Sequence, residues 1–415
     1  MFFFQAEDGI RDRSPSRGLG DVYKRQGFIF TFFSSFGQSY FLGLFNSSIR
    51  ETLSITHGQF GSIYASATLC SSLLLIWVGK KIDDVNIFKF AFFVTILLSF
   101  ACFFFSKISS IFLLFIAIFL MRFSGQGMMS HTASTTISRY FTKTRGRALS
   151  ISWFGLSSAE FILPVLMVYL LTILDWQNLW LIFSITVLIV LPISSYLLIK
   201  NLNLDSRETE SEDIKEIEIK QWKRVEVIKD YRFYIISLNM LAMPWIFTGF
   251  AVFQSFIQTS KGWGPYVIAQ SFMSYSILSV LTLFLSGFLI DKFTSRKLLI
   301  YMNIPLLLAV IVLILFDTSI TAFIFLGLVG ISNGFANILG SSTWAELYGV
   351  KYLGSIKALT TALMVFATAF GTALFGFLID IGFTVGNIAA VSGAYIFLSL
   401  ILLFFVRKKL NPVII

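Results

Sequence analysis

Long stretches without charged residues recur along the chain, and short charged segments separate them. Ten of these runs cover 26–49, 52–79, 90–106, 176–199, 233–260, 262–290, 298–316, 318–345, 358–379 and 381–406. A helix of about 20 residues crosses the hydrocarbon core of a bilayer, so each run predicts one membrane span. Two more apolar stretches, 108–138 and 148–174, are each interrupted by one charge, Arg122 and Glu160. The pattern therefore predicts twelve transmembrane helices.

The composition is that of a membrane protein. Of the 415 residues, 56% are apolar and 13% are charged, whereas a soluble domain carries roughly 25% charged residues. The net charge of +10 is not gathered into a basic patch on a soluble aromatic surface, so nucleic-acid binding is not expected. Cys70 and Cys102 lie in apolar runs, which argues against a disulfide framework or a thiolate metal site. We expect no metal and no cofactor.

Lysine and arginine are distributed unevenly between the two sides of the predicted bundle. With both termini on one side, that side holds 28 of the 32 Lys and Arg residues and the other side holds 3. The remaining residue, Arg122, lies within the membrane. Because cytoplasmic loops carry the excess of positive charge, both termini are predicted to be cytoplasmic, including a tail at 407–415.

Residues 1–26 differ from the rest of the chain. They are polar, mix both signs of charge and contain no apolar core long enough for a signal sequence. The segment resembles translated sequencing-adapter sequence, and the alternative is a disordered cytoplasmic tail. We expect a non-native or disordered leader that contributes nothing to the fold.

An internal repeat divides the remaining chain into two halves. Gly79 and Asp83 recur 208 positions later as Gly287 and Asp291, and Tyr140, Lys143 and Gly146 recur as Tyr348, Lys351 and Gly354. A shared offset in two distant loops predicts two parallel six-helix bundles, 27–199 and 233–406. The linker, 200–232, places apolar residues on one helical face, so it is either an interfacial helix or a solvated connection.

The loops of this repeat resemble those of the major facilitator superfamily. The segment from Gly287 to Lys297 resembles the family's Gly-x-x-x-Asp-Arg/Lys-x-Gly-x-Arg/Lys-Arg/Lys loop, with Thr294 where glycine is usual. The first loop has Asp84 where a basic residue is expected, so we expect it to hold the helix ends together less strongly than the second loop does. In the family such loops stabilise one of two access states. The resemblance assigns this gating role to Gly79, Asp83, Gly287, Asp291, Lys292 and Arg296.

Other segments extend the resemblance over residues 27–406. Arg122-Phe-Ser-Gly-Gln-Gly resembles the family's arginine motif, and Gly155-x-x-x-Ala with Pro164 resembles its glycine–proline motif. The segments that begin at Tyr140 and Trp344 resemble bacterial carriers of the monocarboxylate and oxalate–formate type. The resemblance implies an all-α membrane protein of the major facilitator fold, and a secondary transporter rather than an enzyme.

Arg122 and Glu160 are the two charges that lie deep inside predicted spans. An ionised side chain at the bilayer centre costs ~3 kcal/mol on insertion scales, which makes both residues candidates for function. Glu160 could carry a proton, while Arg122 could attract a substrate carboxylate or control Glu160. The alternative is a permanent buried ion pair that fastens the two helices together.

Polar residues at helical spacing predict the wall of a substrate cavity near the midplane, between the two repeats. In the first span Ser34, Ser35 and Gln38 share a face, and the repeat equates Asn46 with Gln254. Small polar residues also form packing seams between helices, which is the competing interpretation. Including residues of the arginine motif, the predicted cavity residues are Gln38, Asn46, Arg122, Gln126, Trp245, Gln254, Asn333, Asn337 and Ser341.

These features together predict a transporter that works by alternating access. We expect it to carry a small organic anion, in particular a carboxylate, with protons coupled through Glu160 and Arg122. A proton-driven exporter of drugs or amphiphiles is the alternative on the same fold, and a non-transporting sensor or scaffold is the alternative of another class. No Gly-x-x-x-x-Gly-Lys-Ser/Thr loop occurs, so ATP is not expected to drive transport. A monomer in a bacterial inner membrane completes the prediction.

Overall fold

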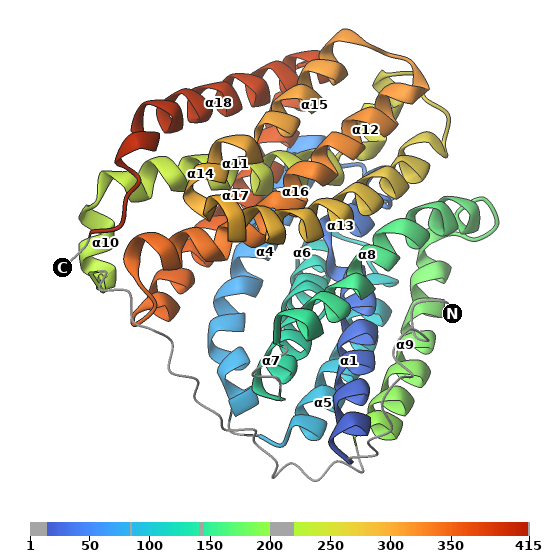
Figure 1. The fold of residues 1–415 in the computed structure, drawn as a ribbon. Coiled ribbons are helices and arrows are strands. Elements are labelled where there is room, and N and C mark those ends of the chain that lie inside the picture. The colour runs from blue at the N-terminus through green and yellow to red at the C-terminus, as the bar shows by residue number, and fades with distance from the viewer. Residues whose placement is uncertain (1–14, 84, 141–144, 200–219, 414–415) are drawn as a thin grey trace, which may run out of the picture.

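The computed structural model describes residues 15–83, 85–140, 145–199 and 220–413. Within these ranges every regular element is helical. Eleven helices are long and apolar enough to cross a membrane, and one pair of helices bent by 66° supplies a twelfth span if it is counted as one. The fold predicted from the charge-free runs is therefore confirmed. Figure 1 shows the helices before the linker packed beneath those that follow it.

The helices before the linker are here called the first bundle. After a broken first span come α4 (His57–Val78), α5 (Ile87–Phe105), α6 (Ile111–Met121), η4 (Arg122–Met129), α7 (Ser130–Tyr140), α8 (Arg145–Leu170) and α9 (Trp176–Ile199). Of these, α6, η4 and most of α7 form one continuous span over Ile111–Ile137. Local side chains begin several helices, as at α4, where Thr56 and Gln59 form a reciprocal capping box.

The first span is not the continuous helix predicted for 26–49. It consists of α1 (Pro15–Ser34), the 3-10 turn η2 (Ser35–Gly37), α2 (Ser39–Gly43) and α3 (Asn46–Leu53). Gln38, between η2 and α2, has the extended backbone angles φ −82° and ψ 151°. No proline or charge marks this break in the sequence, so the uninterrupted apolar run did not predict it.

The helices after residue 219 form the second bundle. They are α10 (Arg224–Lys229), α11 (Tyr231–Val252), α12 (Gln254–Ser260), α13 (Val267–Phe293), α14 (Ser295–Met302), α15 (Ile304–Leu315), α16 (Ser319–Tyr348), α17 (Leu353–Asp380) and α18 (Val385–Val406). The predicted runs 233–260 and 298–316 are both interrupted, at Phe253 and at Asn303. At the second break Ser332 donates a hydrogen bond to the Met302 carbonyl at 2.7 Å, which satisfies a backbone group that a continuous helix would have paired.

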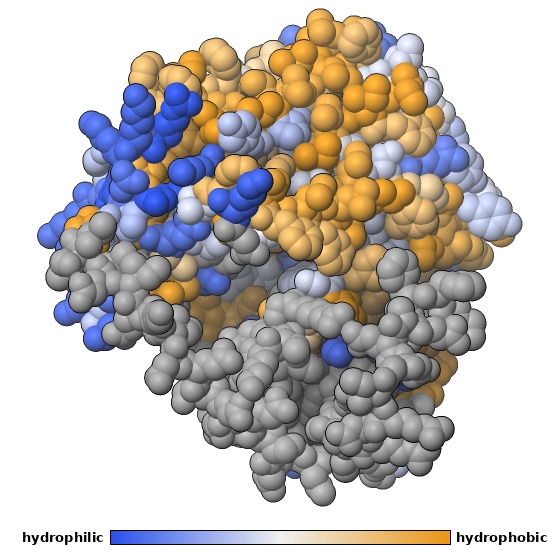
Figure 2. All heavy atoms as spheres, in the orientation of Figure 1, coloured by the Kyte–Doolittle hydropathy of each residue, from blue (hydrophilic) through white to orange (hydrophobic). Residues whose placement is uncertain are grey.

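Successive loops alternate between two faces of the molecule. One face, here called the basic face, carries 79–86, 220–230, 349–352 and 407–413. The opposite face has few Lys and Arg residues and is here called the sparse face; it carries 54–56, 106–110, 171–175, 261–266, 316–318 and 381–384. Figure 2 shows apolar residues over much of the second bundle, with hydrophilic residues gathered near α10 and the C-terminal tail. Large side chains remain exposed along the spans, as at Phe288 and Phe405, both 75% exposed. A bilayer would cover such a surface.

The linker ends on the basic face of the second bundle. The Trp222 amide donates to the Tyr348 carbonyl at 3.0 Å, and the two rings meet edge to face with centroids 5.4 Å apart. Among the described linker residues, the helical part is α10, six residues long. The predicted interfacial helix before residue 220 lies outside the described residues.

Candidate functional site

Arg122 spans the gap between the fourth membrane span and the break in the first. Its Nη1 donates to the Gly37 carbonyl at 3.0 Å and to the Ser39 hydroxyl at 3.2 Å. The guanidinium also lies over the Tyr64 ring, 5.4 Å from its centroid, and the Tyr64 hydroxyl donates to Ser39 at 3.0 Å. The interruption between η2 and α2 leaves backbone groups without helical partners, and Arg122 satisfies one of them.

Two glycines allow the backbones of these spans to touch. A Cβ atom on Gly37 would overlap backbone atoms at Met121 and Gln126, and one on Gly125 would overlap Gly37. On the other side of the contact, the chain from Arg122 to Met129 is a π-helix rather than an α-helix. Such π-segments are rare and occur frequently at functional sites. The Arg122 side chain is therefore positioned by irregular backbone in both spans.

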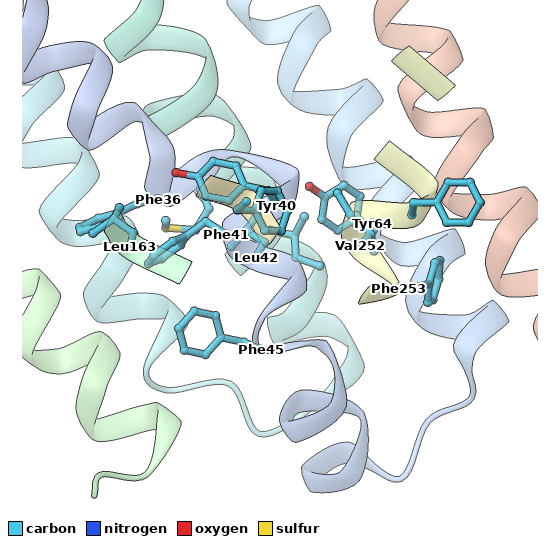
Figure 3. Close-up of a cluster of buried hydrophobic side chains, with 14 of the residues drawn as sticks. Phe36, Tyr40, Phe41, Leu42, Phe45, Tyr64, Leu163, Val252 and Phe253 are labelled. Atoms are coloured by element: carbon cyan, nitrogen blue, oxygen red, sulfur yellow. The ribbon is translucent and has the colours of Figure 1, made fainter. Parts of the chain in front are cut away.

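Aromatic packing holds α2 in its displaced position. Phe36 stacks on Phe41 and Phe183 with centroids 5.0 Å apart in each case, and Phe45 lies 5.1 Å from Trp180. Figure 3 shows Phe36, Tyr40 and Phe41 in one cluster, with Phe45 on the next turn of the chain. Phe41 of α2 itself lies 5.7 Å from Trp180 and 5.9 Å from Phe183, so α2 and the residues that flank it are anchored to α9.

Glu160 lies on α8 at the interface between the bundles. Its side chain is 7% exposed, and it has no hydrogen-bond or ion-pair partner among the described residues. The carboxyl is within electrostatic reach of the Tyr40 and Tyr275 hydroxyls. One turn away, Ser276 of α13 donates to the Ser157 carbonyl of α8 at 2.6 Å, which joins the two bundles.

The structure contains no ion pair between Arg122 and Glu160. Both side chains are buried within the described residues, yet no ion pair joins them and Arg122 is occupied by Gly37 and Ser39. The permanent buried pair considered from the sequence is therefore absent from this conformation. An unpaired buried carboxyl is costly in its ionised form, and binding a proton removes that cost. Of the two buried charged residues, Glu160 is therefore the one that is favoured to change its protonation state.

Aromatic rings surround the hydroxyls near Glu160. Tyr275 stacks on Phe247 with centroids 5.0 Å apart and an interplanar angle of 5°. Phe272 contacts both tyrosines, at 5.5 Å from Tyr40 and 6.0 Å from Tyr275. The two tyrosines within electrostatic reach of the carboxyl thus belong to one aromatic shell built from α2, α11 and α13.

Asn46 and Gln254, the pair equated by the repeat, join the two bundles. Asn46 donates to the Val252 carbonyl at 2.8 Å, and Gln254 donates to the Tyr40 carbonyl at 2.7 Å. Each amide therefore binds the backbone of the opposite bundle. In this conformation both residues seal the interface near the sparse face.

The other predicted cavity residues have varied surroundings. Gln38 and Gln126 are half-buried beside the break, and Asn333 donates to Ser279 at 2.9 Å. Asn337 is exposed, and the side chain of Ser341 lies outside the described residues. Trp245 packs against Phe370, Phe375 and Tyr395.

The predicted gating loops are described in part, because the side chains of Asp83 and Asp291 lie outside the described residues. The Gly79 carbonyl accepts from His131 at 3.0 Å, and Lys292 lies over the Phe293 ring. A Cβ on Gly287 would meet no atom within 4 Å. Arg296 donates to the Leu410 carbonyl and to Asn411. The second loop is therefore tied to the C-terminal tail.

Sequence reasoning missed several residues of the site. Tyr40, Tyr64 and Tyr275 supply hydroxyls around the two charges, and Ser39 is a direct partner of Arg122. Glu346 was also missed, although its carboxylate accepts from the Ser295 amide at 2.8 Å and so caps α14. Tyrosines in apolar runs give little sequence signal, but Gly37 beside Gln38 could have indicated an irregular turn.

Comparison with known proteins places this architecture in a family. The model of the major facilitator superfamily matches residues 27–280, more than half of the chain. The chain belongs to the major facilitator superfamily. It is therefore a membrane transporter by family and not an enzyme. No curated protein sequence matches it.

Solved structures share the fold at low sequence identity. A bacterial homolog of the human lysosomal transporter Spinster, in an inward-facing and unoccupied conformation, has a TM-score of 0.68 and 15% identity, over 96% of this chain and 98% of that one. The nucleoside transporter NupG has a TM-score of 0.66 and 14% identity, over 94% of this chain and 98% of that one. At this identity the similarity concerns the fold alone.

Proposed function

We propose that this transporter couples the movement of a small organic solute to protons, and that Glu160 carries the proton. The observation behind the proposal is a buried carboxyl, 7% exposed, without a hydrogen-bond or ion-pair partner among the described residues. An ionised carboxylate in such a place costs several kcal/mol. Binding a proton removes that cost, and opening the interface to water restores the conditions for its release.

The position of Glu160 supports coupling to alternating access. It lies where α8 of the first bundle meets α13 of the second, next to the bond between Ser157 and Ser276. Rocking of the bundles would separate these helices and change the water exposure of the carboxyl. A proton site in this position responds directly to the conformational change that transport requires.

The basic face is proposed to be cytoplasmic, because cytoplasmic loops carry the excess of Lys and Arg. Bonds between the bundles include those of Asn46 and Gln254 near the sparse face. The bonds of Asp380 to Thr56 and Gly58 of the other bundle lie at the same face. Under this orientation we propose an inward-facing state, and a monomer in a bacterial inner membrane.

For the solute, a carboxylate is the first candidate. Arg122 is a positive charge in the middle of the membrane, and its Nε has no hydrogen-bond partner among the described residues. Nη2 makes no hydrogen bond among the described residues either, so the donors on Nε and Nη2 are left for solute oxygens while Nη1 remains bonded to Gly37 and Ser39. Guanidinium groups bind carboxylates with good geometry.

An organic cation exchanged for protons is the second candidate. The aromatic shell near Glu160, formed by Tyr40, Phe247, Phe272 and Tyr275, favours it. A carboxylate near a group of aromatic rings suits a positively charged organic group. In that mechanism proton and solute would compete for the same carboxyl.

Proteoliposomes with a trapped pH dye test the proposal and separate the two solute classes. Lactate, pyruvate, oxalate and formate are offered singly, and a lipophilic cation such as tetraphenylphosphonium is offered in parallel, all against protein-free liposomes. Symport of an anion with protons acidifies the lumen, whereas exchange of an entering cation for protons makes it alkaline. Either response should be lost in Glu160→Gln. A response that persists in folded Glu160→Gln would exclude Glu160 as the coupling group.

A further inference from the structure

The C-terminal end of α17 binds the N-terminal end of α4 across the interface between the bundles. Oδ2 of Asp380, the last residue of α17, accepts from the Thr56 hydroxyl at 2.6 Å and from the Gly58 amide at 2.9 Å. The first amides of a helix lack helical partners and carry partial positive charge, so a carboxylate is stabilised there. Asp380 therefore caps a helix of the opposite bundle.

A glycine four residues earlier allows this contact. A Cβ on Gly376 would overlap the His57 carbonyl oxygen and Gly58, so a side chain at this position would push the two helices apart. One turn further along the pair, a Cβ on Gly61 would overlap the Thr372 carbonyl. The helix ends thus meet backbone to backbone, and the carboxylate closes the contact.

The same five residues occur at the end of another helix. Gly376-Phe-Leu-Ile-Asp380 repeats Gly287-Phe-Leu-Ile-Asp291, and Gly79 and Asp83 have the same spacing. The copies at 79–83 and 287–291 lie on the basic face, whereas the α17 copy at 376–380 lies on the sparse face. The offset of 208 does not relate this third copy to the other two. The gating role assigned to those loops therefore does not extend to the α17 copy, whose role has to be inferred from its own contacts.

The charged surroundings of Asp380 belong to the first bundle. Arg50 on α3 and the His57 ring at the start of α4 both interact electrostatically with the carboxylate. His57 also packs against Phe253 and Phe256 of the second bundle, with centroids 5.8 and 5.4 Å away. The carboxylate thus has one positive partner across the interface, Arg50, and this interaction is lost if the bundles separate at this face.

We propose that Gly376 and Asp380 form a latch, here called the Asp380 latch, that stabilises the state in which the bundles are closed at the sparse face. The pair α4 and α17 runs antiparallel, so the basic-face end of α4, with Gly79 and Asp83, lies toward the start of α17. Closing one end of this pair requires opening the other. The Asp380 latch therefore sets the balance between the two access states from the end opposite to the predicted gating loops.

Distances between spin labels on the full-length protein in nanodiscs test the latch. Cys70 and Cys102 are first replaced by serine. One label pair at Ser109 and Ser260 reports on the sparse face, and another at Val85 and Ser355 reports on the basic face. Asp380→Asn keeps the shape of the side chain but removes its charge. We expect the ratio of sparse-face-open to sparse-face-closed molecules to rise about tenfold, as for the loss of a charge-assisted hydrogen bond.

A carboxylate that is bonded within one bundle provides the control. Asp317 on the sparse face pairs with Lys261, and both belong to the second bundle. Asp317→Asn should leave the ratio unchanged, and Gly376→Val should shift it in the same direction as Asp380→Asn. If folded Asp380→Asn gives the distance distributions of the parent protein, the latch is refuted. No solute or proton gradient is needed, so this outcome is independent of the role of Glu160.

Discussion

Replacing Arg122 tests whether this residue holds the broken first span to the fourth. In Arg122→Met the Gly37 carbonyl and the Ser39 hydroxyl lose bonds of 3.0 and 3.2 Å to a charged donor. Such bonds contribute about 1.5–3 kcal/mol each, but removing a buried charge returns part of this free energy. The Gly37 carbonyl would remain buried without its side-chain partner. We expect a net loss of about 2–3 kcal/mol in the free energy of unfolding.

A double-mutant cycle isolates the contact with Ser39. The free energy of unfolding is measured by SDS titration in mixed micelles for Arg122→Met, Ser39→Ala and the double variant. Because Arg122 and Ser39 are directly bonded, the two effects should be non-additive by about 1 kcal/mol. Arg122→Met combined with Ser184→Ala is the control, since Ser184 bonds Ser99 between α5 and α9. These two changes should be additive.

The result that would refute the reasoning is additivity in both cycles. It would mean that Arg122 does not hold Ser39 in the membrane-embedded protein, even if Arg122→Met were destabilising. The break at Gln38 would then need another cause, and the anchoring of α2 by Phe36, Phe41 and Phe45 would be the remaining candidate.

Two further predictions concern backbone contact and the linker. Gly125→Val should reduce the yield of folded protein in size-exclusion chromatography, because its side chain would overlap Gly37, whereas Gly287→Ala should fold like the parent, because its Cβ meets no atom. Similar yields for the two would contradict the contact. At the linker, the hydrogen bond from Lys220 holds the pKa of Glu226 below its usual range. The contact is therefore present above the ordinary carboxyl pKa of about 4.3, persists as the pH falls through it, and is lost only at lower pH. Lys220 also lies 4.2 Å from the Trp222 ring centroid, so the emission of Trp222, obtained by subtracting a Trp222→Phe variant, should change below pH ~4. Lys220→Met should abolish that change.

The spans could be predicted from the sequence because a bilayer imposes a simple rule. Each crossing needs a long run without charge, and two charges inside such runs, Arg122 and Glu160, stand out at once. The gating loops were predicted from an offset and a resemblance. These signals are local or periodic, so they do not require knowledge of which helices touch.

The interruptions and partners could not be predicted in the same way. Gln38 lies in an uninterrupted apolar run, and the backbone there departs from helix because Arg122 and the rings of α9 stabilise the alternative. The pairing of Arg122 with Gly37 joins positions 85 residues apart in sequence. One sequence can suggest that a buried arginine needs a partner, but it does not select a backbone carbonyl over the carboxylate of Glu160.

The pair Asn46 and Gln254 shows why a repeat predicts correspondence better than role. Their equivalence was predicted from the offset of 208, and in the structure each amide binds the backbone of the opposite bundle. Two bundles related by an axis along the membrane normal bring equivalent positions to the same depth, where they face each other whenever that end is closed. Asp380 lacks such a counterpart bond, because its partner is the N-terminus of α4 rather than an equivalent side chain. Asn46 and Gln254 form equivalent bonds in both directions across the interface. The bonds of Asp380 have no equivalent in the other direction. The balance between access states can therefore be tuned at Asp380 without altering the symmetric part of the seal.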